Sequence, residues 1–183
     1  ARNPSKIPPQ DRLTVVQADA SSAAELAAAF KGHDAIVSAY NGPRGHEEFS
    51  QLYLAGVRAA IEGAKQSGVS RLLWVGGAGS LFVAPGVQLV DTPQFPAEYR
   101  TEALTARDAL RIFKDEKSLE WTFLSPAPIL VPGQRTGRFR LGGDQVLMDG
   151  DKPGSISVDD LAVAIVDELE KPAHVQQRFT LAY

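Results

Sequence analysis

A cluster of glycines that ends in a serine follows a short apolar segment near the middle of the chain. Leu72–Val75 is followed by Gly76-Gly77-Ala78-Gly79-Ser80. In open parallel sheets, ligands bind beyond the carboxyl ends of the strands, and glycine lets the backbone approach them closely. Ser80 is the only side chain of the cluster that can donate a hydrogen bond, so it is the candidate catalytic residue. A tight strand-to-loop turn without a ligand is the alternative interpretation.

The composition restricts the chemistry that can surround this cluster. The 183 residues include no cysteine, which excludes thiol catalysis, disulfides and cysteine-based metal sites. His33, His46 and His174 lack the spacing of metal ligands, so we expect no metal site. The formal net charge of −3 gives no general attraction to nucleic acid or anionic membranes. No apolar stretch approaches the length of a bilayer span, so we expect a cytoplasmic protein without nucleic-acid or membrane partners.

Strand and helix patterns alternate along the whole chain. The predicted strands are Leu13–Val16, Asp34–Ala39, Arg71–Val75, Trp121–Leu124 and Phe179–Leu181. Predicted helices follow the cap at Ser22, begin at Phe49 and at about Ala97, and follow the cap at Ser157. Strands that alternate with helices pair in parallel through right-handed crossovers. The sequence therefore predicts one α/β domain over residues 1–183, a Rossmann-like doubly wound parallel sheet.

Local signals predict where the helices begin and end. Ser22 and Glu25 have the spacing of a capping box, and Ser157 is placed to cap the last helix. Gly32 and Gly68 are expected to end the first two helices. The residues between 133 and 154 are rich in turn formers and predict a hairpin region.

Several motifs in a fixed order give the chain a specific resemblance. They include the glycine cluster with Leu81, and then Asp91-Thr92-Pro93, Trp121-Thr122, Leu124–Ala127, Arg135–Gly137 and Arg178–Thr180. Across essentially all 183 residues the chain resembles the atypical short-chain dehydrogenase/reductases called NADH-flavin reductases, relatives of biliverdin reductase B and of NmrA-like proteins. The resemblance implies NADP or NAD as cofactor, with FMN or FAD as a substrate rather than a bound cofactor. We expect a small-molecule substrate and a monomer or homodimer.

One motif of the family is missing. A dinucleotide-binding sheet begins with a strand, a glycine fingerprint and a helix whose N-terminus holds the pyrophosphate. No G-x-G-x-x-G or G-x-x-G-x-x-G precedes the first predicted strand, so we expect the first βα unit to be absent from this chain. The expectation is that the natural protein carries such a unit. The isolated chain is then expected to be poorly soluble or to bind nicotinamide nucleotides negligibly.

The resemblance assigns roles to three residues near the start of the chain. Arg2 corresponds to the basic residue that meets the 2′-phosphate of NADP, to which a guanidinium can donate two parallel hydrogen bonds. Asp19 and Ala20 lie where the family contacts the adenine. The alternatives are an exposed terminal arginine for Arg2 and a turn or cap residue for Asp19.

The resemblance also assigns cofactor-binding roles to segments at the ends of three predicted strands. The first passes the pyrophosphate and the nicotinamide ribose, the second borders the nicotinamide, and the third passes its carboxamide side. In that order they contain Ala39, Tyr40 and Gly42, then Gly76 and Gly77, then Ser125, Pro126 and Ala127. A turn that serves only packing is the alternative for the first segment.

Tyr99 lacks the partner that would make it an acid. In typical short-chain dehydrogenases a lysine four residues after the tyrosine lowers its pKa, but residue 103 here is alanine. Without a nearby cation a tyrosine holds its proton too tightly for efficient proton transfer at neutral pH. Tyr99 is therefore predicted to be a pocket wall or a helix-packing residue. Leu81 and Phe82 are predicted to line the substrate pocket with it.

These features favour an NAD(P)H-dependent reductase that transfers hydride to a flavin or a similar conjugated acceptor. Such a transfer between stacked rings depends on proximity and orientation more than on acid–base groups. Residues 126–156, approximately, are predicted to form a small substrate-side region. The alternative is a non-catalytic NAD(P)-sensing protein of the NmrA-like kind. A nucleotide-sugar epimerase is disfavoured by the missing lysine.

Overall fold

The computed structural model describes all 183 residues and is built around a five-stranded sheet. The strand order is β1 (Ile36–Ser38), β2 (Arg71–Val75), β5 (Glu120–Ser125), β11 (Gln177–Ala182) and β7 (Arg140–Gly142). The first four strands run parallel, and β7 runs antiparallel to β11. The predicted α/β fold with a mainly parallel sheet is confirmed.

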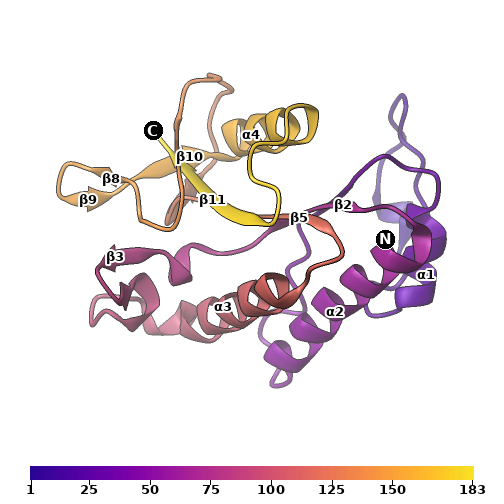
Figure 1. Cartoon of the computed structure of the whole chain (residues 1–183), viewed down its shortest axis with the longest axis horizontal. Helices are drawn as coiled ribbons and strands as arrows, with labels where there is room; N and C mark the ends of the chain where they lie inside the picture. The colour runs from indigo at the N-terminus through magenta and orange to yellow at the C-terminus, as the bar shows by residue number, and fades with distance from the viewer.

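Helices cover both faces of this sheet (Figure 1). On one face, α2 (Phe49–Ser67) and α3 (Arg100–Asp115) pack against Trp74 and Phe123 in the larger of two apolar clusters. On the other face, α4 (Val158–Glu170) packs against Leu73 and Phe179 in the smaller cluster. The short α1 (Ala23–Phe30) lies beside α2. The alternation of apolar side chains along β2 and β5 therefore gives each face its own core.

Short strands lie outside the main sheet. β3 (Phe82–Ala84) and β4 (Val87–Gln88) form a hairpin after the glycine cluster. β6 (Ile129–Val131) pairs in parallel with β10 (Ser155–Ser157), and β8 (Met148–Asp149) pairs with β9 (Lys152–Pro153). The last pair lies in the predicted hairpin region.

The first predicted strand does not form. Residues 13–16 are irregular, and Leu13 and Val16 are 44% and 48% exposed. Only Ala1 lies beside this segment, with its amine donating to the Val16 carbonyl at 2.8 Å and its carbonyl accepting from Ala18 N at 3.3 Å. A single residue cannot form the series of hydrogen bonds that joins two strands. Residues 13–16 therefore do not become a strand, although their β-branched side chains favour one.

The predicted helix signals act largely as expected. Ser22 Oγ accepts from Glu25 N at 3.3 Å, and Ser157 Oγ accepts from Asp160 N at 3.0 Å. The Glu25 carboxylate does not complete a capping box, because it accepts from Asp19 N at 2.9 Å instead. Gly68 ends α2 with a φ of 79°, a conformation that glycine adopts without strain.

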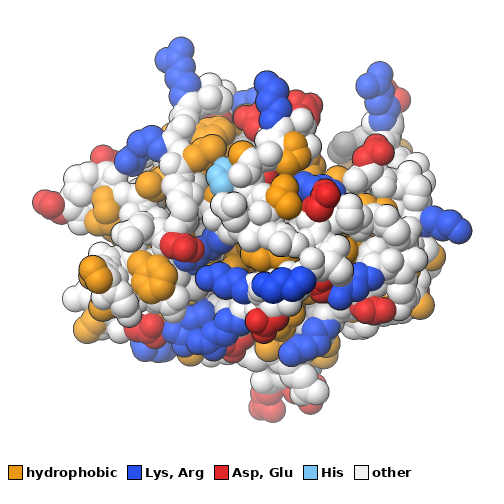
Figure 2. All heavy atoms as spheres, viewed as in Figure 1, with side chains coloured by type: hydrophobic (Ala, Val, Ile, Leu, Met, Phe, Trp, Pro, Cys, Tyr) orange, Lys and Arg blue, Asp and Glu red, His pale blue; other side chains and the backbone are white.

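The exposed side of α3 carries charges of both signs, which are interspersed over the face shown in Figure 2. Asp108 and Arg111 form an ion pair there at 2.7 Å, with more than a third of each side chain exposed. No helix in the structure is both long enough and apolar enough to cross a bilayer.

A buried charged network holds the amino ends of the parallel strands. Arg71 and Glu168 are only 6% and 5% exposed, and Arg71 Nη2 donates to Glu168 Oε1 at 2.9 Å. Arg71 Nη1 also donates to Thr122 Oγ1 at 2.7 Å, and His174 Nδ1 lies 2.7 Å from Glu168 Oε2. Burial raises the pKa of Glu168, but the hydrogen bonds from His174 and Ala173 outweigh it and lower that pKa below its ordinary value.

Removing the Glu168 carboxylate is expected to destabilise the fold strongly. Glu168→Ala leaves the Arg71 charge buried and unpaired, so the free energy of unfolding should fall by about 3–5 kcal/mol in urea titrations. Asp108→Ala, which removes only a surface ion pair, should cost less than about 1 kcal/mol. Similar losses in the two variants would contradict a stabilising role for the buried network.

The Glu168 network also predicts a direction of pH dependence. Because the folded-state pKa of Glu168 lies below its unfolded value of about 4.5, its contribution is fully present above that pH. The contribution is lost as the pH falls through the folded-state pKa. Urea titrations across the acid range should show this loss in the wild type and not in Glu168→Ala.

Candidate functional site

The parallel register brings the ends of three strands to the same edge of the sheet. Ser38 in β1 pairs with Trp74 in β2, and Trp74 pairs with Phe123 in β5. The segments that follow these strands contain the cofactor-binding residues predicted from the sequence. Parallel strands therefore place Ala39–Gly42, Gly76–Ser80 and Ser125–Ala127 along one rim, where open α/β sheets bind ligands.

A cavity of about 850 Å³ runs along the free edge of β1, from Ala35 before the strand to Pro43 after it. Five of the predicted cofactor-binding residues line it together, although they come from distant parts of the sequence: Arg2, Asp19, Ala20, Tyr40 and Gly42. The remaining predicted cofactor residues, Ala39, Gly76, Gly77, Ser125, Pro126 and Ala127, do not line it. The predicted cofactor-binding residues therefore form two sets. The five that line the cavity are the cavity group, and the six at the ends of the strands are the strand-end group.

Charge in the cavity group is contributed by Arg2 and Asp19. Asp19 Oδ1 accepts from Ser21 N at 2.8 Å and from Ser21 Oγ at 2.7 Å, which lowers the pKa of the Asp19 carboxyl, with a smaller effect of the Arg2 charge. The two hydrogen bonds from Ser21 are typical of a turn, which is the alternative role considered for Asp19 in the sequence analysis. Arg2 is exposed and forms no ion pair, so its guanidinium is available to an anion.

Tyr40 forms an aromatic wall of the cavity. Its ring stacks on Tyr53 at a centroid distance of 5.8 Å and meets Trp74 edge-on at 6.3 Å. The ring lies so close to Gly56 in α2 that a Cβ there would overlap it. Burial raises the pKa of the Tyr40 phenol, so this residue stays protonated at neutral pH and serves as a fixed surface.

Two glycines of the cluster are required by packing. A Cβ at Gly76 would overlap the Phe123 ring, and a Cβ at Gly79 would lie 2.7 Å from the Ala103 Cβ in α3. Gly76 N donates to the Leu124 carbonyl at 2.8 Å, which continues the sheet by one residue. The turn interpretation therefore accounts for these two glycines. Gly77 is less crowded and half-buried, with its nearest contact at 3.3 Å.

Ser80 and the three predicted pocket residues lie in different environments. Ser80 is 2% exposed, and its Oγ accepts from Arg178 Nη1 at 2.9 Å. Leu81 has no exposed surface because it is part of the interior, which differs from the predicted position in a pocket wall. Phe82 is half-buried, and Tyr99 is 58% exposed at the start of α3. Of the three, Phe82 alone is partly covered and still reachable.

Ser125 is an unpartnered hydroxyl at the end of β5. It is fully buried, and its Oγ has no hydrogen-bond partner. Pro126 beside it is half-buried and Ala127 is 3% exposed. A buried hydroxyl without a partner costs about 1–3 kcal/mol, so this position fits a site completed by a polar ligand group.

The polar residues around Ser80 were not singled out as site residues from the sequence. Arg178 in β11 donates from Nε to Asp144 Oδ1 at 2.7 Å, and Gln88 Nε2 donates to the Ser80 carbonyl at 3.1 Å. Arg107 Nη1 in α3 donates to Gln88 Oε1 at 3.1 Å. The signal in the sequence was a charged residue within the otherwise largely apolar segment of β11 (Gln177–Ala182), but its partners Ser80 and Asp144 lie far away in the sequence.

Comparison with known proteins agrees with this geometry. The model of the NAD(P)H-binding family matches residues 1–172, and the chain belongs to that family. It is 41% identical over 184 residues to the protein YwnB of Bacillus subtilis, named as uncharacterized, with 98% of this chain and 83% of YwnB covered.

Solved structures resemble the chain over nearly its whole length. A Burkholderia pseudomallei protein provisionally named as an exported protein has 42% identity and a TM-score of 0.88, covering 100% of this chain and 85% of that one. A Bacteroides thetaiotaomicron protein provisionally named as an epimerase has 42% identity and a TM-score of 0.90, with coverages of 100% and 82%. A Streptococcus pneumoniae protein provisionally named as an NADH-flavin reductase has 30% identity and a TM-score of 0.77, with coverages of 94% and 81%.

The packing of Gly76 gives a direct test of the strand-end geometry. Gly76→Ala should lower the free energy of unfolding by about 1–3 kcal/mol, because its Cβ displaces the buried Phe123 ring. Gly143→Ala is the matched control, since no atom lies within 4 Å of a Cβ there. In a Phe123→Leu background the cost of Gly76→Ala should shrink, and an unchanged cost would refute this contact.

Proposed function

We propose that the protein is an NAD(P)H-dependent oxidoreductase that transfers hydride to a flavin or a similar conjugated acceptor. The observation that carries the proposal is the convergence of Arg2, Asp19 and Tyr40 on one cavity at the sheet edge. These residues are separate in sequence, and each is expected to hold a part of the same cofactor. Membership in the NAD(P)H-binding family supports the assignment.

The residues around the cavity and the strand ends fit parts of the cofactor, although no glycine fingerprint for the pyrophosphate is among them. Arg2 would hold the 2′-phosphate of NADP, Asp19 and Ala20 the adenine side, and Ala39, Tyr40 and Gly42 the pyrophosphate and ribose. Gly76 and Gly77 would border the nicotinamide, and Ser125–Ala127 its carboxamide side. The unpartnered Ser125 hydroxyl supports a polar ligand group at this point. When bound, the reduced nicotinamide supplies the hydride.

A conjugated acceptor suits the groups around the strand ends. Tyr99 is exposed, and residue 103, where a lysine would activate it, is an alanine that packs against Gly79. A flavin delocalises incoming charge itself and needs no dedicated acid. The Streptococcus pneumoniae relative, provisionally named as an NADH-flavin reductase, supports this acceptor class.

Residues 126–156 are proposed as the substrate-side region. This stretch lies beyond β5, and Phe82 N donates to the Asp144 carbonyl at 2.8 Å, so the stretch contacts the segment after the glycine cluster. Asp160 holds its outer loop by accepting from Thr136 Oγ1 at 2.6 Å and from Gly137 N at 2.8 Å. The region is therefore attached at two points around the proposed acceptor site.

A steady-state assay with NADPH and FMN tests the proposed reaction. Oxidation of NADPH at a rate that saturates with flavin supports the reductase. Cofactor binding by calorimetry without turnover of FMN, FAD or other conjugated acceptors would favour the NAD(P)-sensing alternative. Conversion of a nucleotide sugar without net NADPH oxidation would favour an epimerase, the activity for which the Bacteroides thetaiotaomicron relative is named.

Arg2 is expected to set the preference for NADPH. In a protein that carries the N-terminal βα unit expected from the sequence, Arg2→Ala should weaken NADPH binding by about 1.5–3 kcal/mol, because a charge-assisted contact is lost. It should weaken NADH binding much less. Arg12→Ala is the matched control, since Arg12 is exposed in the same segment and does not line the cavity. Calorimetric titration with both cofactors measures this, and equal losses for NADPH and NADH would rule out the 2′-phosphate role.

A further inference from the structure

We propose that Arg178 is a positioning residue that acts through Ser80, making the Ser80 hydroxyl a stronger hydrogen-bond donor to the acceptor at the strand ends. This inference rests on the proposed function and adds a residue that assists the proposed hydride transfer. Hydride transfer adds two electrons and one proton to the acceptor and leaves the nicotinamide oxidised. The acceptor therefore carries extra negative charge until it takes a proton from solvent.

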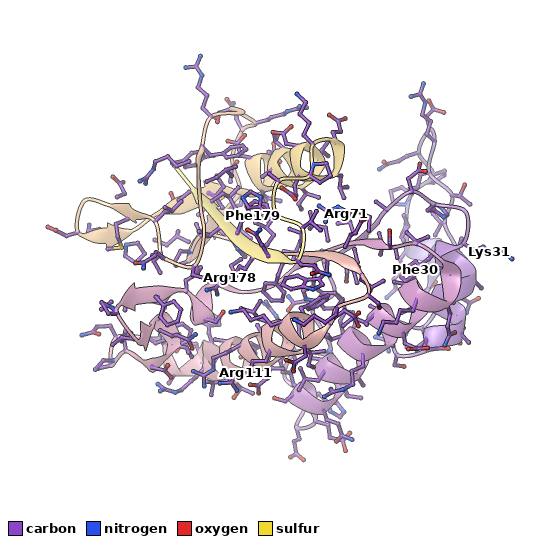
Figure 3. The ribbon with its side chains drawn as sticks, viewed as in Figure 1. Phe30, Lys31, Arg71, Arg111, Arg178 and Phe179 are labelled. Atoms are coloured by element: carbon purple, nitrogen blue, oxygen red, sulfur yellow. The ribbon has the colours of Figure 1, made fainter.

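Arg178 reaches Ser80 from across the sheet. It is the register partner of Phe123, so both side chains leave the sheet on the face covered by α3 and the glycine cluster. Figure 3 shows Arg71 and Arg178 toward opposite ends of the sheet. The Arg178 side chain is only 2% exposed and donates to Ser80 Oγ at 2.9 Å.

The bond from Arg178 fixes what the Ser80 hydroxyl can do. A guanidinium only donates, so Ser80 Oγ is the acceptor in this pair. The Ser80 hydroxyl is 2% exposed and makes no other hydrogen bond through its side chain, so its hydrogen is not used within the fold. A cation on the oxygen draws electron density from the O–H bond, and charge-assisted bonds of this kind are about twice as strong as neutral ones.

Asp144 modulates the charge that Ser80 experiences. Its carboxylate forms an ion pair with Arg178, and its backbone carbonyl accepts from Arg178 Nη2 at 3.3 Å. The Asp144 side chain is about half exposed, so water screens it, whereas the buried guanidinium faces Ser80 with little screening. Asp144 therefore holds the Arg178 side chain in place, while the positive charge of Arg178 still acts on the Ser80 hydroxyl.

The chain contains no cysteine, which provides a test that does not depend on turnover. Ser80→Cys introduces a single thiol at the proposed position, and its pKa is read from the pH dependence of the thiolate ultraviolet absorbance, which needs no access by a reagent. A second change, Arg178→Met, should raise this pKa by about one unit or more, because an adjacent cation favours the thiolate. Asp144→Asn should lower it, because the neutralising charge is removed.

Arg107→Met is the matched control for the thiol measurement. Arg107 also tethers the glycine cluster, through Gln88, but its ion pair is with Asp91 and not with Ser80. It should therefore leave the thiol pKa unchanged, with folding checked by urea titration. Equal pKa values with and without Arg178, or an equal response to Arg107→Met, would overturn the proposal.

Kinetics supply the second test. Ser80→Ala should lower kcat for FMN reduction by about tenfold or less, since one hydrogen bond is lost. Arg178→Met should lower kcat similarly and leave KM for NADPH within about twofold, and it should add little when Ser80 is already alanine. If the loss of kcat in the double variant equals the product of the losses in Ser80→Ala and Arg178→Met, the two residues act independently. That result would contradict a role of Arg178 through Ser80.

The two tests separate this proposal from the proposed function. If the wild type binds NADPH but reduces no conjugated acceptor, the reductase assignment fails, and the thiol titration still decides whether Arg178 acts on position 80. If flavin is reduced and the thiol pKa ignores Arg178, the positioning role fails alone.

Discussion

The close approach of the glycine cluster to its neighbours is the constraint on which the site depends. Because Gly76 has no side chain, β2 ends directly over the Phe123 ring, and because Gly79 has none, α3 lies against the cluster at Ala103. This contact favours a small residue at position 103, where a lysine would be needed to activate Tyr99. The close packing of the glycine cluster against α3 and the absence of a lysine four residues after Tyr99 are therefore two results of one arrangement.

Two buried arginines, Arg71 and Arg178, lie at different levels of the sheet and have different hydrogen-bond partners. Arg71 donates to Thr122 and Glu168 at the amino ends of the strands, where the network joins β2, β5 and α4. Arg178 donates to a half-exposed carboxylate and to a serine hydroxyl. In the first arrangement the two Nη atoms of Arg71 donate to groups of the fold, although Arg71 Nε has no partner. In the second, the guanidinium is shared between Asp144 and the Ser80 hydroxyl.

The sequence predicts the helices and strands of the main sheet well where their ends depend on residues that are adjacent in the sequence. The bounds of β2, the Ser157 cap and the end of α2 at Gly68 follow from apolar runs, a serine and a glycine that act on adjacent residues. The strand predicted at Leu13–Val16 fails because a strand requires a neighbouring strand, which the pattern cannot reveal. The Arg178–Ser80 pair was missed for the same reason, since it joins residues 98 positions apart. Leu81 was predicted to line the pocket because it directly follows the glycine cluster, yet its side chain has no exposed surface.

Unused hydrogen-bonding capacity provides an argument for a ligand that does not depend on family membership. Among other buried hydroxyls, Thr122 Oγ1 bonds to the His174 carbonyl and Ser157 Oγ accepts from Asp160 N. The buried Tyr53 hydroxyl accepts from Trp74 Nε1 and donates to no protein atom. At the carboxyl ends, the Ser125 hydroxyl has no partner and the Ser80 hydroxyl accepts without donating. Each unmet bond costs free energy that a fold could avoid with alanine. Under the proposed function, the Ser80 and Ser125 hydroxyls near the ends of β2 and β5 would donate their hydrogens to the acceptor and the nicotinamide.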